Sequence, residues 1–131
     1  MIIRPGSADD TAALAALFTA SVHGLGPQQY DAAQLRAWAP AEPDLAMWGA
    51  RLVELEVRIA DVDGAAAGFV GFRPDGYVHL LFVHPGFARR GIGRALLGRA
   101  EAEARAAGAT ALTTEASLVA RPAFEHAGYA V

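Results

Sequence analysis

The sequence predicts a single mixed α/β domain, in which helices flank a sheet. Apolar residues follow a helical spacing in the first third of the chain and alternate with polar residues after Arg51. Two turn signals, Asp63-Gly64 and Pro74-Asp75-Gly76, separate the apolar runs that follow, and a further helix and strand come after them. The 131 residues suffice for one domain, over 1–131, and are too few for two.

The N-terminal part predicts a strand and two helical regions. Residues 1–4 are expected to form the strand, because Pro5-Gly6 ends it. Ser7 is a favourable N-cap for a helix over 8–22, whose apolar residues recur at helical spacing. A looser helical region follows in two pieces, 30–38 and 45–52, which prolines divide.

The rest of the chain predicts strands at 53–59, 67–72 and 77–83. The last of these is apolar on both faces except at His79, which indicates the middle of a sheet. A helix is expected to start near Gly91 and to end at Gly108. Its inward residues are expected to be Leu96, Leu97, Ala100, Ala104 and Ala107. A strand at 111–115, a helix at 120–127 and a strand from 129 complete the order.

Composition excludes several classes of function. The net charge of −3 gives no basic field, which argues against nucleic acid as a partner. Cysteine is absent, so disulfide scaffolds, cysteine-ligated zinc and thiol catalysis are excluded, and the four histidines lack the spacing of a metal site. The sequence has neither a secretory segment nor an apolar run of about 18 residues, so we expect a cytoplasmic protein without a membrane partner.

The segment from Val83 to Leu97 carries the strongest functional signal. Gly91 and Gly93 leave the backbone bare at the start of a helix, where unpaired N–H groups and the helix dipole attract anions. Arg89, Arg90 and Arg94 crowd the same end, where each cation costs about 0.3–1 kcal/mol unless an anion binds. The segment therefore predicts a pyrophosphate site, and the rival interpretation is a plain strand-to-helix turn with surface arginines. His84 is expected to cap this loop.

The same loop resembles the acetyl-CoA loop of the GCN5-related N-acetyltransferase (GNAT) family. Val83-His84-Pro85 and Gly91-Ile92-Gly93 with Leu96 match its pattern, whereas a Rossmann loop would need glycine at Leu96 and a Walker loop would need a lysine. The C-terminal segment resembles the second signature of the family at Ser117, Ala120, Phe124, Glu125, Gly128 and Tyr129. The order of elements agrees, so the resemblance covers nearly the whole chain, and residues 30–38 resemble a subgroup of small bacterial acetyltransferases.

This resemblance implies a mainly antiparallel sheet with a shortened C-terminal strand region. It also implies acetyl-CoA as co-substrate, without a metal, and a small-molecule or peptide amine as acceptor. The amine would attack directly, since no cysteine can carry the acetyl group, and a backbone N–H near Val83 would polarise the thioester carbonyl. The residues expected to bind acetyl-CoA are Leu81, Phe82, Val83, Arg89, Arg90, Gly91, Ile92, Gly93, Arg94 and Phe124.

Catalytic and acceptor-binding residues are less strongly marked. A period of two places His79 on one face with Tyr77, Leu81 and Val83. We expect His79 to be the general base and Tyr77 a proton donor to the thiolate, a role that Tyr30 or Tyr129 could also take. The rival interpretation of His79 is a hydrogen-bonded core histidine. Acceptor binding is expected at Tyr30, Trp38 and Glu115, with packing and a solvated strand end as the alternatives. Trp48 is expected to be a packing residue.

Three departures from the family pattern favour a second hypothesis, an acetyl-CoA-binding module with weak or no turnover. Ala88 stands where the family has arginine or glutamine, and Phe124 stands where it often has a tyrosine acid. The chain also ends at Val131, which would leave a sheet edge open, so a homodimer that seals this edge is one expectation. A plain α/β interaction domain is the third hypothesis.

Overall fold

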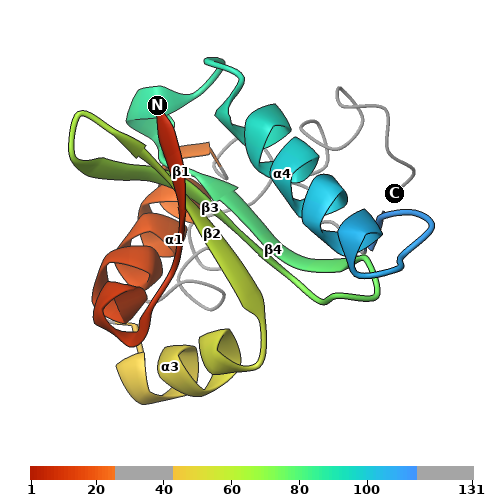
Figure 1. Ribbon diagram of the computed structural model, residues 1–131. Coiled ribbons are helices and arrows are strands. Elements are labelled where there is room, and N and C mark those ends of the chain that lie inside the picture. The colour runs from red at the N-terminus through yellow and green to blue at the C-terminus, as the bar shows by residue number, and fades with distance from the viewer. Residues whose placement is uncertain (26–42, 115–131) are drawn as a thin grey trace.

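A five-stranded sheet lies between two layers of helix in the computed structural model, which describes residues 1–25 and 43–114 (Figure 1). The strand order is β1-β2-β3-β4-β5, antiparallel throughout except for the parallel pair β4–β5. Helices α1 and α3 cover one face of the sheet, and α4 covers the other (Figure 1). The expected mixed fold with a mainly antiparallel sheet is confirmed. Its elements are β1 (Ile2–Pro5), η1 (Ala8–Asp10), α1 (Thr11–Leu25), α3 (Leu45–Val53), β2 (Glu56–Val62), β3 (Ala65–Phe72), β4 (Tyr77–Val83), η3 (Pro85–Phe87), α4 (Ile92–Ala106) and β5 (Thr113–Thr114).

Both predicted hairpin turns are present. Asp63 and Gly64 join β2 to β3 with φ of 51° and 83°, the left-handed conformation that a tight two-residue hairpin requires. Gly76, with φ of 98°, precedes β4. Its carbonyl oxygen accepts a hydrogen bond of 3.0 Å from the Thr113 N–H, so this turn also anchors the segment that leads to β5.

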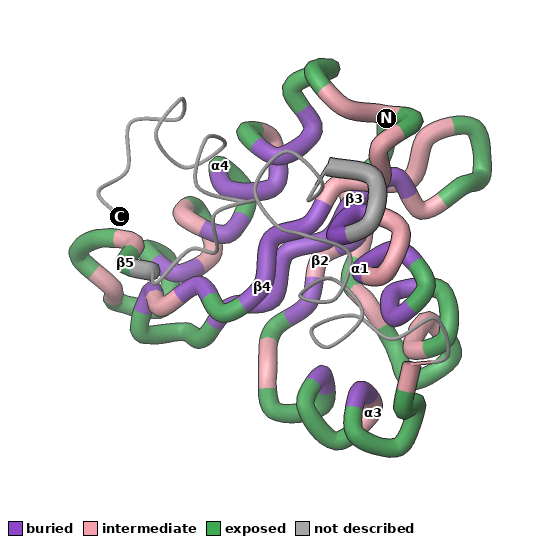
Figure 2. Tube along the Cα trace, turned by 180° about the vertical axis from the view of Figure 1, so that it is seen from behind, coloured by how far each residue is buried: buried purple, intermediate pink, exposed green. Residues whose placement is uncertain are grey.

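Each face of the sheet has its own apolar core (Figure 2). The α1/α3 face combines buried residues of both helices with Val57, Ile59, Phe69, Leu80 and Phe82. The α4 face combines Ile92, Leu96, Leu97 and Ala100 with Ala60, Ala67, Val70, Phe72, Val78 and Leu81. Gly68 lets α4 approach the sheet, because a Cβ there would lie 3.1 Å from Ile92 Cγ2 and 3.2 Å from Leu96 Cδ1. The sheet is therefore fully covered in its centre, as the run of apolar residues in β4 predicts.

Several predicted boundaries are wrong. The strand expected from residue 53 begins only at Glu56, because α3 continues through Val53, whose side chain is 82 % exposed. Asp44 caps α3 by accepting a hydrogen bond of 3.1 Å from the Met47 N–H, which sets where this helix starts. Ala107, expected inside, is exposed, since it lies beyond the last turn of α4. The predicted elements at 30–38, 120–127 and 129–131 lie outside the described residues.

Candidate active site

An irregularity in β4 shapes the candidate site. Phe72 of β3 pairs with Val78 of β4, but the preceding Gly71 pairs with Leu80. His79 is therefore an extra residue without a Cα partner on β3, which is a β-bulge. Bulges redirect the side chains of a strand and are enriched beside active sites.

The bulge overturns the predicted grouping of side chains on β4. Val78 and Leu81 both belong to the core under α4, and Val83 packs against the same core, whereas Leu80 and Phe82 belong to the core under α1 and α3. Tyr77 alternates with Val78 and so faces the α1/α3 side. The rings of Tyr77 and His79 lie 4.4 Å apart between centroids, so His79 shares the side of Tyr77. Leu81 and Val83 lie on the opposite face, contrary to the prediction from strict alternation.

His79 is a solvent-accessible imidazole with a perturbed pKa. Its side chain is exposed, so the interpretation as a core histidine is wrong. Loss of water on part of the ring, together with the positive charges of Arg73 and Arg51, lowers the pKa of His79 below its usual 6.5, and Asp75 opposes this shift. The imidazole is therefore mostly neutral at pH 7 and able to accept a proton.

The turn before β4 holds the charged neighbours of His79 in place. The Asp75 carboxylate accepts a hydrogen bond of 3.0 Å from the Tyr77 N–H and forms an ion pair with Arg73. The Arg73 N–H in turn donates to the Tyr77 carbonyl oxygen at 2.9 Å. This exposed cluster fixes the start of β4, two residues before the candidate base.

The loop after β4 is preorganised by its own hydrogen bonds. The His84 N–H donates to the Ala67 carbonyl oxygen at 2.8 Å, which ties the loop to β3. His84 Nδ1 accepts a hydrogen bond of 3.0 Å from the Gly86 N–H and so caps η3, as expected. The Ala88 N–H donates to the Pro85 carbonyl oxygen at 3.2 Å and closes this turn.

Beyond Ala88, the loop adopts a backbone conformation that is typical of anion-binding loops. Arg89 and Gly91 both adopt positive φ, of 63° and 76°, and Gly91 is the N-cap of α4. Such alternation of left- and right-handed residues forms concavities that bind anions. In the described part of the chain, none of the N–H groups from Arg89 to Arg94 donates a hydrogen bond. The positive φ of a non-glycine residue is strained by roughly 1–3 kcal/mol, which is typical of functional loops.

The electrostatics of this loop favour an anionic ligand. Arg89, Arg90 and Arg94 are exposed, and none forms an ion pair within residues 1–25 and 43–114. The first turn of α4 has no acidic residue to balance them. The Arg90 guanidinium carbon lies 5.3 Å from the centroid of the Phe87 ring, which holds this side chain beside the loop. Free N–H groups, a helix N-terminus and three cations together fit a pyrophosphate group.

The described residues include only some of the predicted binding residues. Leu81 and Phe82 are buried and Val83 is half-buried, so the strand offers its backbone rather than its side chains to a ligand. Within the described residues, β5 pairs with β4 only at Tyr77 and Val78, before the bulge. The remaining predicted residues, Tyr30, Trp38, Glu115 and Phe124, lie outside the described residues. Trp48 is 3 % exposed and packs against Phe18 in the core under α1 and α3, so its prediction as a packing residue is confirmed.

Sequence reasoning missed Arg51, whose charge acts on His79 from a different element. The spacing from Trp48 to Arg51 could have indicated that both lie on one face of a helix. That this face lies on the same side of the sheet as His79 follows only from the tertiary structure.

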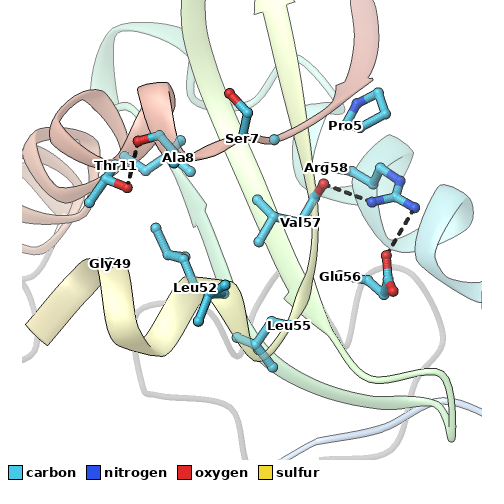
Figure 3. Close-up of a pocket in the computed structure, with 13 residues that line it drawn as sticks. Pro5, Ser7, Ala8, Thr11, Gly49, Leu52, Leu55, Glu56, Val57 and Arg58 are labelled. Carbon is cyan, nitrogen blue, oxygen red and sulfur yellow. Dashed lines mark hydrogen bonds and ion pairs between the residues drawn. The ribbon is translucent and has the colours of Figure 1, made fainter.

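A surface pocket of about 450 Å³ lies apart from this site, between η1, the C-terminal end of α3 and the start of β2 (Figure 3). Its walls are largely apolar and include Leu52, Leu55 and Val57. Arg58 also lines it, but this guanidinium already pairs with Glu103 and Glu56. The described residues that line the pocket therefore offer no free charge to a ligand, and we assign the pocket no role in the chemistry at His79.

Comparison with known proteins gives consistent matches. The family model "Acetyltransferase (GNAT) domain" matches residues 28–131. The uncharacterized N-acetyltransferase YafP of Escherichia coli (strain K12) is 33 % identical over 130 residues, which are 97 % of this chain and 79 % of that protein. A GCN5-related N-acetyltransferase from Rhodopseudomonas palustris superposes with a TM-score of 0.89 at 37 % identity, over 97 % of this chain and 79 % of the other. The PaiA N-acetyltransferase from Thermoplasma acidophilum, solved with coenzyme A, shares the fold with a TM-score of 0.71 at 19 % identity, over 82 % of this chain and 73 % of the other. Among the helices of the described residues, none combines the length and the apolar character that a membrane span requires.

Proposed function

The chain belongs to the GNAT family of acetyl-CoA-dependent N-acetyltransferases, and on this premise we propose that it transfers the acetyl group to a primary amine by direct attack. Acetyl-CoA supplies the activated acetyl group. The new N–C bond forms as the C–S bond breaks, and the amine proton must pass to a base. The predicted extent of the catalytic domain, 1–131, and the predicted cytoplasmic location both stay predictions.

The observation that carries this proposal is the loop from Arg89 to Arg94. Its six N–H groups have no acceptor in the described residues, and its three arginines have no acidic partner there. We assign to these amides the pyrophosphate of acetyl-CoA, with Arg89 or Arg90 supplying the charge that Ala88 cannot. The backbone of Leu81, Phe82 and Val83 would pair with the pantetheine arm as an added strand does.

We assign the base to His79. An alkylamine arrives mostly protonated at pH 7, and only its neutral form attacks. The imidazole is exposed and its pKa is lowered, so it can take this proton directly or through a water molecule. Tyr77, whose ring contacts His79, is our candidate proton donor to the leaving thiolate. A backbone N–H near Val83 is our candidate for polarising the thioester carbonyl.

The test is a screen of amine acceptors that measures the release of free CoA thiol by the whole protein. We expect thiol release that depends on the acceptor, and an acetylated product by mass spectrometry. Calorimetry with acetyl-CoA provides the parallel binding measurement. Binding without acceptor-dependent release would favour the alternative of a weak or inactive acetyl-CoA-binding module, which Ala88 and Phe124 support. Absence of binding would contradict both and leave an interaction domain.

A further inference from the structure

Arg51 reaches the side of the sheet on which His79 lies. It belongs to the last turn of α3, and its guanidinium carbon lies 5.8 Å from the centroid of the Trp48 ring. Trp48 packs against Phe18 with 4.9 Å between centroids, and Phe18 packs edge-on against Phe82 of β4 at 4.8 Å. This chain of rings joins the helix that carries Arg51 to the strand that carries His79.

A second contact holds the end of α3 beside the bulge. Leu55 follows α3 and packs over Gly71, where a Cβ would lie 3.1 Å from Leu55 Cδ1 and 3.3 Å from Leu80 Cδ1. Leu80 is the residue that follows His79 in the bulge. The charge of Arg51 consequently acts on His79, as its lowered pKa reflects.

Within the described residues, the charges around His79 are not balanced. The charged side chains of these residues that act on it are Arg73, Arg51 and Asp75. Arg73 and Asp75 neutralise each other in an ion pair. Arg51 forms no ion pair with any residue of the two described ranges, and its side chain is exposed. In the described part of the chain, the Arg51 guanidinium that acts on the candidate base therefore has no acidic partner.

We propose that Arg51 binds a carboxylate of the acceptor, so that the acceptor is a primary amine that also bears a carboxylate, such as an amino acid. This inference rests on the proposed acetyl transfer at His79. It makes Arg51 a specificity-determining residue, which discriminates among amines without taking part in the proton transfer.

The chemistry of the approaching amine favours this choice. A simple ammonium ion is repelled by a guanidinium beside the base, whereas a zwitterion presents an anion to it. The planar fork of N–H donors on arginine matches a carboxylate through two parallel hydrogen bonds. One guanidinium balances the single negative charge of a carboxylate. A phosphate monoester carries a charge of about −1.5 to −2 at pH 7, so one guanidinium would leave part of that charge uncompensated.

The experiment compares matched acceptors with the whole protein. Each amino acid in the panel is tested beside its C-terminal amide and its decarboxylated amine, and kcat/KM is measured by thiol release. We expect kcat/KM for the amino acid to exceed kcat/KM for its amide and for its decarboxylated amine by at least about tenfold, the size expected for a hydrogen-bonded charge pair. Arg51→Ala should lower kcat/KM about 10- to 100-fold for the amino acids and should not lower it for the amides, from whose ammonium group it removes a repelling charge. Arg51→Lys should keep part of the preference.

Arg105→Ala is the matched control, because Arg105 is also an exposed arginine in the last turn of a helix. It should leave the preference intact. If the wild type shows no preference for the carboxylated acceptors, or if Arg51→Ala weakens amides and acids equally, the inference is overturned and Arg51 only packs on Trp48. Calorimetry of the amino acids with the CoA-loaded protein separates this failure from failure of the proposed chemistry. Acid-selective binding that depends on Arg51 supports the inference even where His79→Gln shows that the base lies elsewhere.

Discussion

The imidazole of His79 lies edge-on to the phenol ring of Tyr77, with 4.4 Å between the ring centroids. The two residues are two apart in β4, so ordinary alternation already places both side chains on one face, and the bulge at His79 turns Leu81 and Val83 to the opposite face. The two groups proposed to move protons thus lie together at one exposed point of the sheet.

Replacing His79 by glutamine should remove the proposed base while keeping a polar side chain of similar reach. We expect kcat to fall roughly 10²–10⁴-fold with the affinity for acetyl-CoA little changed, since general base catalysis contributes about that much. Steady-state kinetics and calorimetry measure the two quantities. Tyr77→Phe keeps the ring contact and removes only the hydroxyl, so it distinguishes loss of packing from loss of a proton donor. If His79→Gln retains its rate, a different base such as Glu115 or a water chain must act.

The pH dependence of kcat/KM should depend on the charges around His79. Activity requires the neutral imidazole, so the rate falls as pH drops through its pKa, which lies below 6.5 in the folded protein. Arg73→Ala removes one positive charge and leaves Asp75 unpaired, and both changes raise this pKa. The acidic limb should therefore move to higher pH, while Arg99→Ala, on α4, should leave it in place. If the acidic limb does not move in Arg73→Ala, the group that titrates there is not His79.

Gly91→Val should abolish the proposed pyrophosphate site. Gly91 has φ of 76°, which a β-branched residue rarely adopts, and the new side chain would cover the N–H groups at the start of α4. We expect the affinity for acetyl-CoA to fall at least about tenfold by calorimetry, the loss of one charge-assisted contact or more. Gly98→Ala is the control, because Gly98 lies exposed within α4 with no atom near its Cβ position. That variant should bind acetyl-CoA normally and gain stability. If Gly91→Val also binds acetyl-CoA normally, the pyrophosphate site lies elsewhere.

Much of the fold could be predicted because local chemistry determines it. The Asp63-Gly64 turn needs positive φ at both residues, and that pair adopts it readily. The loop from Val83 to Leu97 could be interpreted for the same reason, since glycine and proline restrict its backbone directly. The turn of Gly91 and the cap of His84 both agree with the sequence.

The shared face of Tyr77 and His79 was predicted correctly, but the faces of Leu81 and Val83 were not, because a bulge depends on pairing with β3 and leaves no sequence signal within β4. One inserted residue reverses the face of every side chain on one side of it. Strict alternation therefore grouped His79 with Leu81 and Val83, which pack under α4 instead. The contribution of Arg51 was missed for a related reason, since it depends on α3 packing against the sheet.

Gly76→Ala should destabilise the fold strongly, because a Cβ at Gly76 would collide with the Ala111 carbonyl oxygen. The φ of 98° adds backbone strain. We expect a loss of about 3 kcal/mol in the free energy of unfolding, measured by urea denaturation. Gly64→Ala shares the positive φ but has open space around it, so it should lose only about 1 kcal/mol. Equal losses would mean that the contact between the turn and residue 111 adds nothing.

The N-terminal ion pair should stabilise the protein in a pH-dependent way. Asp10 accepts hydrogen bonds from Arg4 at 2.9 and 3.0 Å and from the Ser7 N–H at 2.9 Å. The bonds from Arg4 are the main reason that the pKa of Asp10 falls from 3.8 to about 2. Because the folded pKa is the lower one, the stabilisation is fully present above about pH 4. It is lost as pH falls through about 2.

Asp10→Asn tests this stabilisation. The Arg4 side chain is 38 % exposed, so solvent screens the pair and we expect a loss of about 1 kcal/mol at pH 7 rather than the full value of the shift. Urea denaturation across a pH series should show the difference between wild type and variant shrinking toward zero near pH 2. Asp9→Asn, at the neighbouring exposed position in the same first turn, should change stability by only a few tenths of a kcal/mol. If both variants lose the same free energy at every pH, the helix dipole accounts for the effect and the contact with Arg4 contributes nothing measurable.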